Sequence, residues 1–204
     1  LGHLSKNIRI AAMKTPLVDE DVGIAASIRI VNPQSMKQED FIKGGTATQP
    51  MMDFLTECLR HGISICVAGV YKRQVTNSVI HTLTRDSENE RQRVDQIALL
   101  DMALRFNPDI IVVGEMRGPE ANAAQEAART GVAVVTTIHS NSCEATYRRM
   151  VSLCKRAVDM SDETLLSYVT EAYPIVAFCK QLENRERRLM EIQECEIRPD
   201  GTRS

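Results

Sequence analysis

One segment constrains the fold of this chain more than any other: residues 108–117 read P-D-I-I-V-V-G-E-M-R. Its centre is an unbroken run of β-branched residues bounded by Pro108 and Gly114. Such a run predicts a central strand of a parallel sheet, buried on both faces. Glu115 follows at the carboxyl end of this strand, the edge where open α/β sheets bind ligands. A carboxylate there can hold a magnesium ion through water or polarise an attacking water; the alternative is a cap or a surface ion pair.

Two further segments predict buried strands. Residues 133–139 read A-V-V-T-T-I-H and end in His139, and residues 63–69 read I-S-I-C-V-A-G and end in Gly69. A strand that ends in glycine typically opens a phosphate-binding loop of the form G-x-x-x-x-G-K-[ST]. Here the residues after Gly69 are V-Y-K-R-Q, with neither a second glycine nor a Gly-Lys pair. The sequence therefore predicts two strand ends of a nucleotide site, at Glu115 and His139, but lacks the usual phosphate-binding loop.

Helical patterns separate these strands. The first amphipathic pattern lies between Thr48, which can cap a helix, and Gly62, which ends it. A second helix is predicted over residues 94–106, and an alanine-rich helix opens at Pro119 and closes at Gly131. This alternation of strands and helices predicts a parallel sheet with right-handed crossovers.

The remaining patterns lie towards the two ends of the chain. Residues 8–13 and 23–31 read as two strands near the amino end. Asn141, with Glu144 three residues later, is typical of a capping box for the next helix. Residues 175–197 read as a strand, a polar turn and a second strand, which predicts antiparallel strands at the edge of the sheet.

Five motifs, taken together, are specific enough to indicate a family: G-I-A-A-S-I-R-I at residues 23–30, G-G-T-A-T at 44–48, N-S-V-I-H-T-L-T-R at 77–85, A-L-R-F-N-P-D-I-I-V-V-G-E-M-R at 103–117 and T-T-I-H-S-N-S at 136–142. They resemble the ATPases of type II and type IV secretion systems, and most closely the tight-adherence (Flp) pilus assembly ATPases, CpaF-like. The resemblance runs over nearly the whole chain. It implies a motor in which magnesium-dependent ATP hydrolysis drives pilus biogenesis or protein export.

The resemblance also implies a fold and a domain organisation. The expected fold is α/β, a RecA-like P-loop NTPase core with a mostly parallel sheet, preceded by the last strands of a truncated N-terminal domain. On this basis residues 1–33 are the remnant of the N-terminal domain and residues 34–48 a linker. Residues 49–204 form the RecA-like ATPase domain, with an apparent deletion near residues 70–76.

The resemblance assigns catalytic roles to two residues. Glu115 matches the acid that positions water and holds Mg²⁺ through water. His139 matches the family's histidine box, which senses the γ-phosphate of ATP. A lone histidine is otherwise most often structural, but titratable groups at sheet ends gather in functional sites.

Four residues are predicted to contact the nucleotide. Gly69 ends the strand before the phosphate position, and Arg117 follows the catalytic acid. Arg85 matches an arginine of the family's acidic box, and Arg29 matches one that approaches the nucleotide from the N-terminal domain. Arginine suits bidentate phosphate contacts, although a surface ion pair is the alternative for each arginine.

The chain departs from the family pattern in two places. In the family, a full phosphate-binding loop, a helix, a strand and an acidic segment follow the strand that here ends at Gly69. In this chain residues 70–74 lead directly to the segment that begins at Asn77. We interpret residues 70–74 as a joint, produced either by a true deletion or by an error in sequence assembly. The family also usually has histidine where this chain has Val132. We therefore expect the chain to bind ATP poorly and not to hydrolyse it.

The resemblance and the composition together define the expected partners. The family implies a homohexamer that acts on a platform protein of the inner membrane, so the expected location is the cytoplasm, peripheral to the inner face of the membrane. A net charge of -2 and the lack of a basic stripe disfavour nucleic acid, and with it a DNA-translocating relative of the same fold. The alternative to a motor is a non-catalytic RecA-like interaction subunit of a secretion assembly.

The cysteine pattern excludes some classes of site. None of the six cysteines forms a C-x-x-C pair, and no histidine lies at metal-ligand spacing from one. We therefore expect free, mostly buried thiols in a reducing cytosol. No apolar run approaches the ~20 residues of a membrane span.

Overall fold

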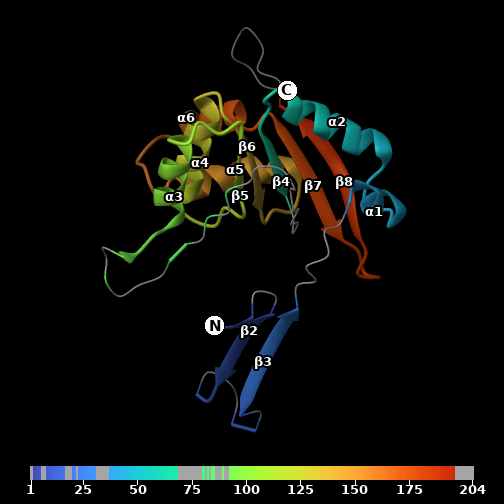
Figure 1. The fold of residues 1–204 in the computed structure, drawn as a ribbon, viewed down its shortest axis with the longest axis vertical. Coiled ribbons are helices and arrows are strands. Elements are labelled where there is room, and N and C mark those ends of the chain that lie inside the picture. The colour runs from blue at the N-terminus through green and yellow to red at the C-terminus, as the bar shows by residue number, and fades with distance from the viewer. Residues whose placement is uncertain are drawn as a thin grey trace. The chain divides into compact units, whose positions relative to one another are not determined.

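The computed structural model describes residues 2–5, 8–16, 20–21, 23–30, 37–68, 80, 82, 84–85, 89 and 92–195. The chain divides into two compact units, Leu1–Met36 and Lys37–Ser204 (Figure 1). Each unit is a separate body with its own sheet.

The amino-terminal unit is a three-stranded antiparallel sheet in the order β1-β2-β3. Its strands are β1 (Gly2–Ser5), β2 (Ile8–Lys14) and β3 (Ile24–Ile30). The two strands predicted here are confirmed as β2 and β3, whereas β1 was not predicted. Gly23, at a φ of 66°, precedes β3 in a left-handed conformation that glycine adopts without strain.

The larger unit alternates helices and strands. Its elements are α1 (Gln38–Lys43), α2 (Gln49–Arg60), β4 (Ile65–Ala68), α3 (Gln96–Leu104), β5 (Ile110–Val113), α4 (Glu120–Arg129), β6 (Ala133–Ile138), α5 (Cys143–Cys154), α6 (Asp162–Ala172), β7 (Ile175–Gln181) and β8 (Arg187–Glu194). The five strands form one sheet in the order β5-β6-β4-β7-β8. All neighbours are parallel except β7 and β8. The predicted α/β fold with a mostly parallel sheet is confirmed.

This topology brings several strand ends together. Because β5, β6, β4 and β7 run in the same direction, their carboxyl ends lie along one edge of the sheet. Strand β6 lies between the other two strands that carry predicted site residues: Val113 of β5 pairs with Thr136, and Ala68 of β4 pairs with Ile138. The fold therefore places the residues that follow β5 next to those that follow β6.

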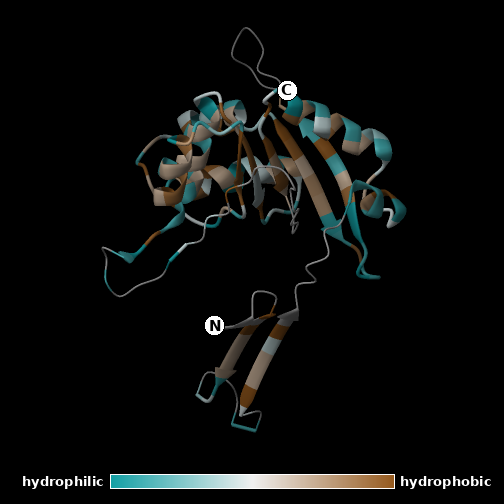
Figure 2. Cartoon of the chain, viewed as in Figure 1, coloured by the Kyte–Doolittle hydropathy of each residue, from teal (hydrophilic) through white to brown (hydrophobic). Residues whose placement is uncertain are grey.

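Helices cover the two faces of the sheet unequally. Helices α4, α5 and α6 lie on one side and α2 lies on the other (Figure 1). The larger core joins the first side, where side chains such as Cys66, Val134 and Met150 are almost fully buried. Figure 2 shows hydrophobic colours concentrated along the strands and hydrophilic colours on the outer surface of α2. On the second side, Leu55 of α2 packs against the smaller clusters around Ile65 and Ala177.

Strand β5 differs from our prediction. We expected a central strand buried on both faces. In the structure, β5 is an edge strand of the sheet and pairs with β6. Its side chains alternate: Ile111 and Val113 are 8% and 6% exposed, whereas Ile110 and Val112 are 43% and 64% exposed. The reason is that helices α3 and α4 pack against one face of β5, and no described helix covers the other.

Most predicted helix boundaries agree with the structure. The hydroxyl of Thr48 accepts a hydrogen bond from the Met51 N–H and caps α2. The capping box at Asn141 is wrong: α5 begins one residue later, because the Ser142 hydroxyl accepts the bond from the Ala145 N–H at 3.0 Å. The segment that we interpreted as a linker contains the short helix α1.

None of the described cysteines forms a disulfide bond, and most of them are buried. Burial raises the pKa of the Cys143 thiol to about 12, with a smaller contribution from the nearby Glu191 carboxylate. Burial likewise raises the pKa of Cys154 to about 12. These thiols therefore stay protonated and inert near neutral pH. Within the same described ranges, no helix is both long enough and apolar enough to cross a bilayer.

Candidate functional site

The ends of β5 and β6 are joined by hydrogen bonds beyond the strands themselves. The Met116 N–H donates to the Thr137 carbonyl at 2.9 Å. The Thr137 hydroxyl donates to the Gly114 carbonyl at 2.7 Å. These bonds hold the loop after β5 against the end of β6, so Glu115 and His139 lie close to each other.

Glu115 is the centre of a three-residue cluster. Its Oε1 lies 3.1 Å from Nε2 of His139, and its Oε2 lies 3.1 Å from Nε of Arg117. The Glu115 side chain is 26% exposed, whereas those of His139 and Arg117 are 63% and 76% exposed. The half-buried carboxylate thus lies between two nitrogen donors. The side chains of these donors are more exposed, so a ligand in solution can reach them.

The Glu115 carboxylate could take part in binding a magnesium ion. A carboxylate has about four lone-pair positions, so Glu115 can accept from water in addition to its two partners. Mg²⁺ is usually held by one or two carboxylates together with waters and substrate phosphates. One carboxylate fits that pattern, and the described residues contain no group of three or more acidic, histidine or cysteine side chains that could hold a metal alone. A magnesium ion bound at Glu115 would therefore need its other oxygen ligands from water and from the phosphates of a bound substrate.

The loop that carries Glu115 is anchored on several sides. The Gln96 side-chain amide donates to the Glu115 carbonyl at 3.4 Å. The Met116 side chain, 2% exposed, is buried in the core. On the far side of the loop, Nη1 of Arg156 donates to the Arg117 carbonyl at 3.1 Å. Sequence reasoning missed these anchors, because hydrogen bonds to a loop backbone leave no motif.

Of the other predicted nucleotide contacts, Arg85 is not part of this cluster. Arg85 forms an isolated backbone bridge with Val94, and its side chain donates to the Gln92 side chain at 3.2 Å rather than to Glu115. Arg29 lies on β3 in the amino-terminal unit, where its backbone pairs with Arg9. Gly69 and the joint at residues 70–74 lie outside the described residues.

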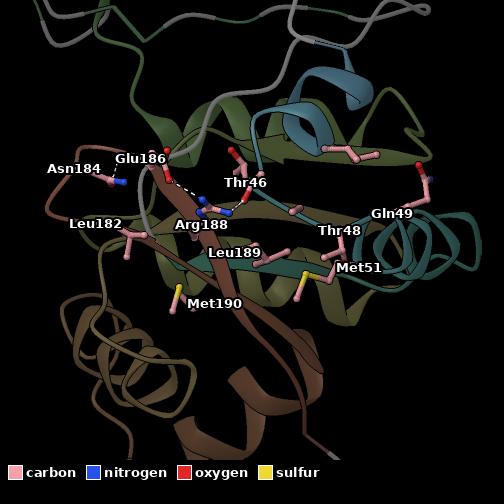
Figure 3. Close-up of a pocket in the computed structure, with 13 residues that line it drawn as sticks. Thr46, Thr48, Gln49, Met51, Leu182, Asn184, Glu186, Arg188, Leu189 and Met190 are labelled. Atoms are coloured by element: carbon pink, nitrogen blue, oxygen red, sulfur yellow. Dashed lines mark hydrogen bonds and ion pairs between the residues drawn. The ribbon is translucent and has the colours of Figure 1, made fainter.

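A separate cavity of about 730 Å³ lies between the loop before α2 and the β7–β8 hairpin (Figure 3). Arg188 spans its wall: one nitrogen donates to the Gly45 carbonyl at 2.7 Å and another lies 2.6 Å from the Glu186 carboxylate. The Leu189 N–H donates to the Thr46 carbonyl at 2.6 Å. None of the predicted site residues that the structure describes lines this cavity. The G-G-T segment was its only sequence signal, and glycine pairs mostly serve turns.

Comparison with known proteins places these observations in a family. A family model described as "Type II/IV secretion system protein" matches residues 63–203. The "Probable conjugal transfer protein TrbB" of Sinorhizobium fredii is 25% identical over 190 residues, which cover 80% of this chain and 57% of that protein. The "Type IV pilus assembly ATPase PilB" of Pseudomonas aeruginosa is 35% identical over 95 residues, 46% of this chain and 17% of that protein. The chain therefore spans little more than half of the TrbB protein.

Among solved structures, the VirB11 ATPase of the Brucella suis type IV secretion system, in complex with sulphate, has a similar fold. Its TM-score is 0.56, with 19% sequence identity, and the match covers 92% of this chain and 70% of that one. At this identity the likeness concerns the fold alone. It agrees with the sheet and the flanking helices of the larger unit.

Proposed function

The chain belongs to the type II/IV secretion system protein family, and from that premise we propose that it is part of an ATPase motor for secretion or pilus assembly. The observation that carries the proposal is the contact between Glu115 and His139 across the ends of two parallel strands. A carboxylate and an imidazole at this edge suit chemistry on a bound nucleotide, since ligands of open α/β sheets bind there. A scaffold without activity has no need of both groups.

Glu115 is the catalytic group in this proposal. Its carboxylate can accept a proton from water or orient water for attack on a phosphate. The contacts with His139 and Arg117 fix the direction of the carboxylate, and catalysis of phosphoryl transfer depends mainly on such positioning. ATP and Mg²⁺ are the proposed cofactors, and bound Mg²⁺ would neutralise charge on the phosphate oxygens.

His139 and Arg117 are proposed to respond to the nucleotide. Both side chains are more than half exposed and both contact Glu115. An arriving phosphate would compete with the Glu115 carboxylate for these donors. We propose that His139 senses the γ-phosphate in this way, so that the state of the nucleotide changes the contacts of Glu115.

The chain as it stands lacks the usual means of holding phosphates. Strand β4 ends at Ala68, and the following sequence contains no G-x-x-x-x-G-K-[ST] motif. The lysine and the backbone amides of that loop supply much of the positioning and charge stabilisation in phosphoryl transfer. We therefore propose that this chain binds ATP weakly and hydrolyses it slowly or not at all. The alternative is a non-catalytic RecA-like subunit, which the missing motif favours if the joint is genuine.

Assembly and location follow from the family and are proposed on that basis. We propose a homohexamer that works with a platform protein of the inner membrane, at the cytoplasmic face of that membrane. Membership of the tight-adherence branch is a proposal of the same kind, as is the division into residues 1–33, 34–48 and 49–204. Arg29, Arg85 and Gly69 remain proposed nucleotide contacts within such an assembly.

Phosphate release from magnesium-ATP tests the proposal. The protein with its present sequence is compared with a repaired protein, which carries a G-x-x-x-x-G-K-[ST] segment between Gly69 and Asn77. Hydrolysis that appears only in the repaired protein, and disappears again with Glu115→Gln, supports a damaged motor. A repaired protein that binds ATP but never hydrolyses it supports the non-catalytic subunit. Hydrolysis by the unrepaired chain that depends on Glu115 would refute the proposed deficiency.

A further inference from the structure

Glu120 is a buried acid that the proposed function leaves unused. It is the first residue of α4 and only 8% exposed. The residue before it, Pro119, occupies the N-cap position and supplies no side-chain hydrogen bond to the helix. A negative charge is favourable at the amino end of a helix. The Glu120 carboxylate, however, turns back towards the loop that precedes α4.

The contacts of this carboxylate are with the backbone of that loop. Its Oε1 accepts hydrogen bonds from the Arg117 N–H at 2.6 Å and from the Gly118 N–H at 2.8 Å. Hydrogen bonds to an ionised acceptor are roughly twice as strong as neutral ones. One buried oxygen therefore fixes two consecutive peptide groups, those of the Arg117 and Gly118 N–H, in the loop that follows Glu115.

Gly118 is shaped to admit the carboxylate. A Cβ at this position would lie 2.9 Å from Oε2 of Glu120, closer than a real Cβ contact allows. The missing side chain leaves room for the second oxygen while the first accepts the two bonds. Gly118 and the Glu120 carboxylate are therefore in close contact, through both the Gly118 N–H and the space left by its missing side chain.

The position of Glu120 complements the anchors described above. Met116 and Gln96 hold the first part of the loop, next to β5 and β6. Glu120 holds the second part, at Arg117, whose Nε contacts the Glu115 carboxylate. Loss of the Glu120 bonds would free the N–H of Arg117, with the bond from Arg156 to the Arg117 carbonyl left as the anchor at this residue. The backbone that carries one of the two partners of Glu115 would then be held on one side instead of two.

We propose that Glu120 is a positioning residue, whose buried carboxylate fixes the loop so that Glu115 stays in contact with Arg117 and His139. The inference rests on the proposed function only for the use to which this geometry is put. The geometry itself is testable in the chain without nucleotide.

Amide hydrogen exchange measured by NMR tests the proposal with two variants. Glu120→Asp keeps the charge at the helix end but shortens the side chain, so the carboxylate no longer reaches the Arg117 N–H. We expect that amide to exchange about tenfold faster or more, as for loss of a hydrogen bond to a charged acceptor. Glu120→Gln keeps the reach and one carbonyl oxygen, so we expect a smaller acceleration. If Glu120 served only the helix dipole, the order of the two variants would be reversed.

A second measurement follows the cluster itself. Glu115→Gln should shift the NMR signals of the His139 ring in the wild-type background, and this response should weaken in the Glu120→Asp background. The matched control is Glu144→Asp, because Glu144 also lies in the first turn of a helix but is 74% exposed and pairs with Arg148.

The outcomes separate the two proposals. Unchanged exchange of the Arg117 amide in Glu120→Asp, or an undiminished response of the His139 ring, would overturn the positioning role. Absence of ATP hydrolysis in the repaired protein would count against the proposed function and leave the exchange result standing.

Discussion

Nε2 of His139 lies 3.1 Å from Oε1 of Glu115, and this contact joins the ends of two adjacent parallel strands. Neither residue is close to the other in the sequence; the register between β5 and β6 brings them together. The contact is therefore a property of the fold, and it is sensitive to anything that moves one strand end relative to the other.

In a protein repaired between Gly69 and Asn77, both members of this pair should be needed for coupled activity. Glu115→Gln should lower kcat by roughly 10²–10⁴-fold, the range of general acid–base catalysis, with nucleotide affinity nearly unchanged. His139→Ala should uncouple hydrolysis from motion between domains, a step that often limits such enzymes. Steady-state kinetics and nucleotide binding measure these effects. Glu144→Gln, an exposed acid on α5, should change neither; wild-type rates in both site variants would make the pair structural.

Gly45→Ala should destabilise the protein by about 1–3 kcal/mol, because the residue has a φ of 65° and strain at such positions has that magnitude. A Cβ there would also lie 2.6 Å from Nη1 of Arg188. Gly62→Ala is the matched control, with a φ of 73° and open space around the new Cβ. Urea unfolding should show a larger loss for Gly45→Ala than for Gly62→Ala. The difference should shrink when Arg188 is also changed to alanine; equal losses would show that Arg188 yields freely.

The two faces of β5 should respond differently to the same substitution. Val113→Thr places a hydroxyl in the core, which costs roughly 1–3 kcal/mol. Val112→Thr changes a side chain that is 64% exposed, so the free energy of unfolding should move by less than about 0.5 kcal/mol. Denaturant titration of the two variants measures both values. Similar losses would indicate that an additional element covers Val112 in solution.

The buried thiols predict a loss of stability in alkali. The pKa values of Cys143 and Cys154 rise from the ordinary 9.0 to about 12 on folding, mainly because burial disfavours the thiolate. Above pH 9.0 the unfolded chain loses these protons first, so the free energy of unfolding falls until the pH passes about 12. Urea unfolding at several pH values should show this decline. The Cys143→Ala/Cys154→Ala variant should start less stable and decline less steeply; an identical slope would contradict the assignment.

The sequence predicted the positions of the strands along the chain better than their places in the sheet. The β-branched run of β5 correctly indicated a strand, because that tendency is local. Its place in the sheet was wrong, since a run of four residues does not say which neighbours will cover it. The shared edge of Glu115 and His139 was predictable, because parallel strands necessarily end on the same side.

Other parts of the site had no local signal. Glu120 reads as an ordinary first-turn acid, and its hydrogen bonds to the loop depend on how the chain turns at Gly118. The same holds for Thr137, whose hydroxyl could equally have faced solvent. Arg85 matched a motif, yet its side chain bonds to Gln92, because a motif fixes residue type and not the partner.

The bond from the Leu189 N–H to the Thr46 carbonyl has a consequence for the edge of the sheet at β8. Strand β8 is the last strand of the sheet, and an unprotected last strand invites pairing with a foreign chain. The loop before α2 occupies a hydrogen-bonding position on that outer side and, through Arg188 and Gly45, is fastened there. At Leu189, a segment of the same chain therefore takes the hydrogen-bonding position that a foreign strand would need in order to pair with β8.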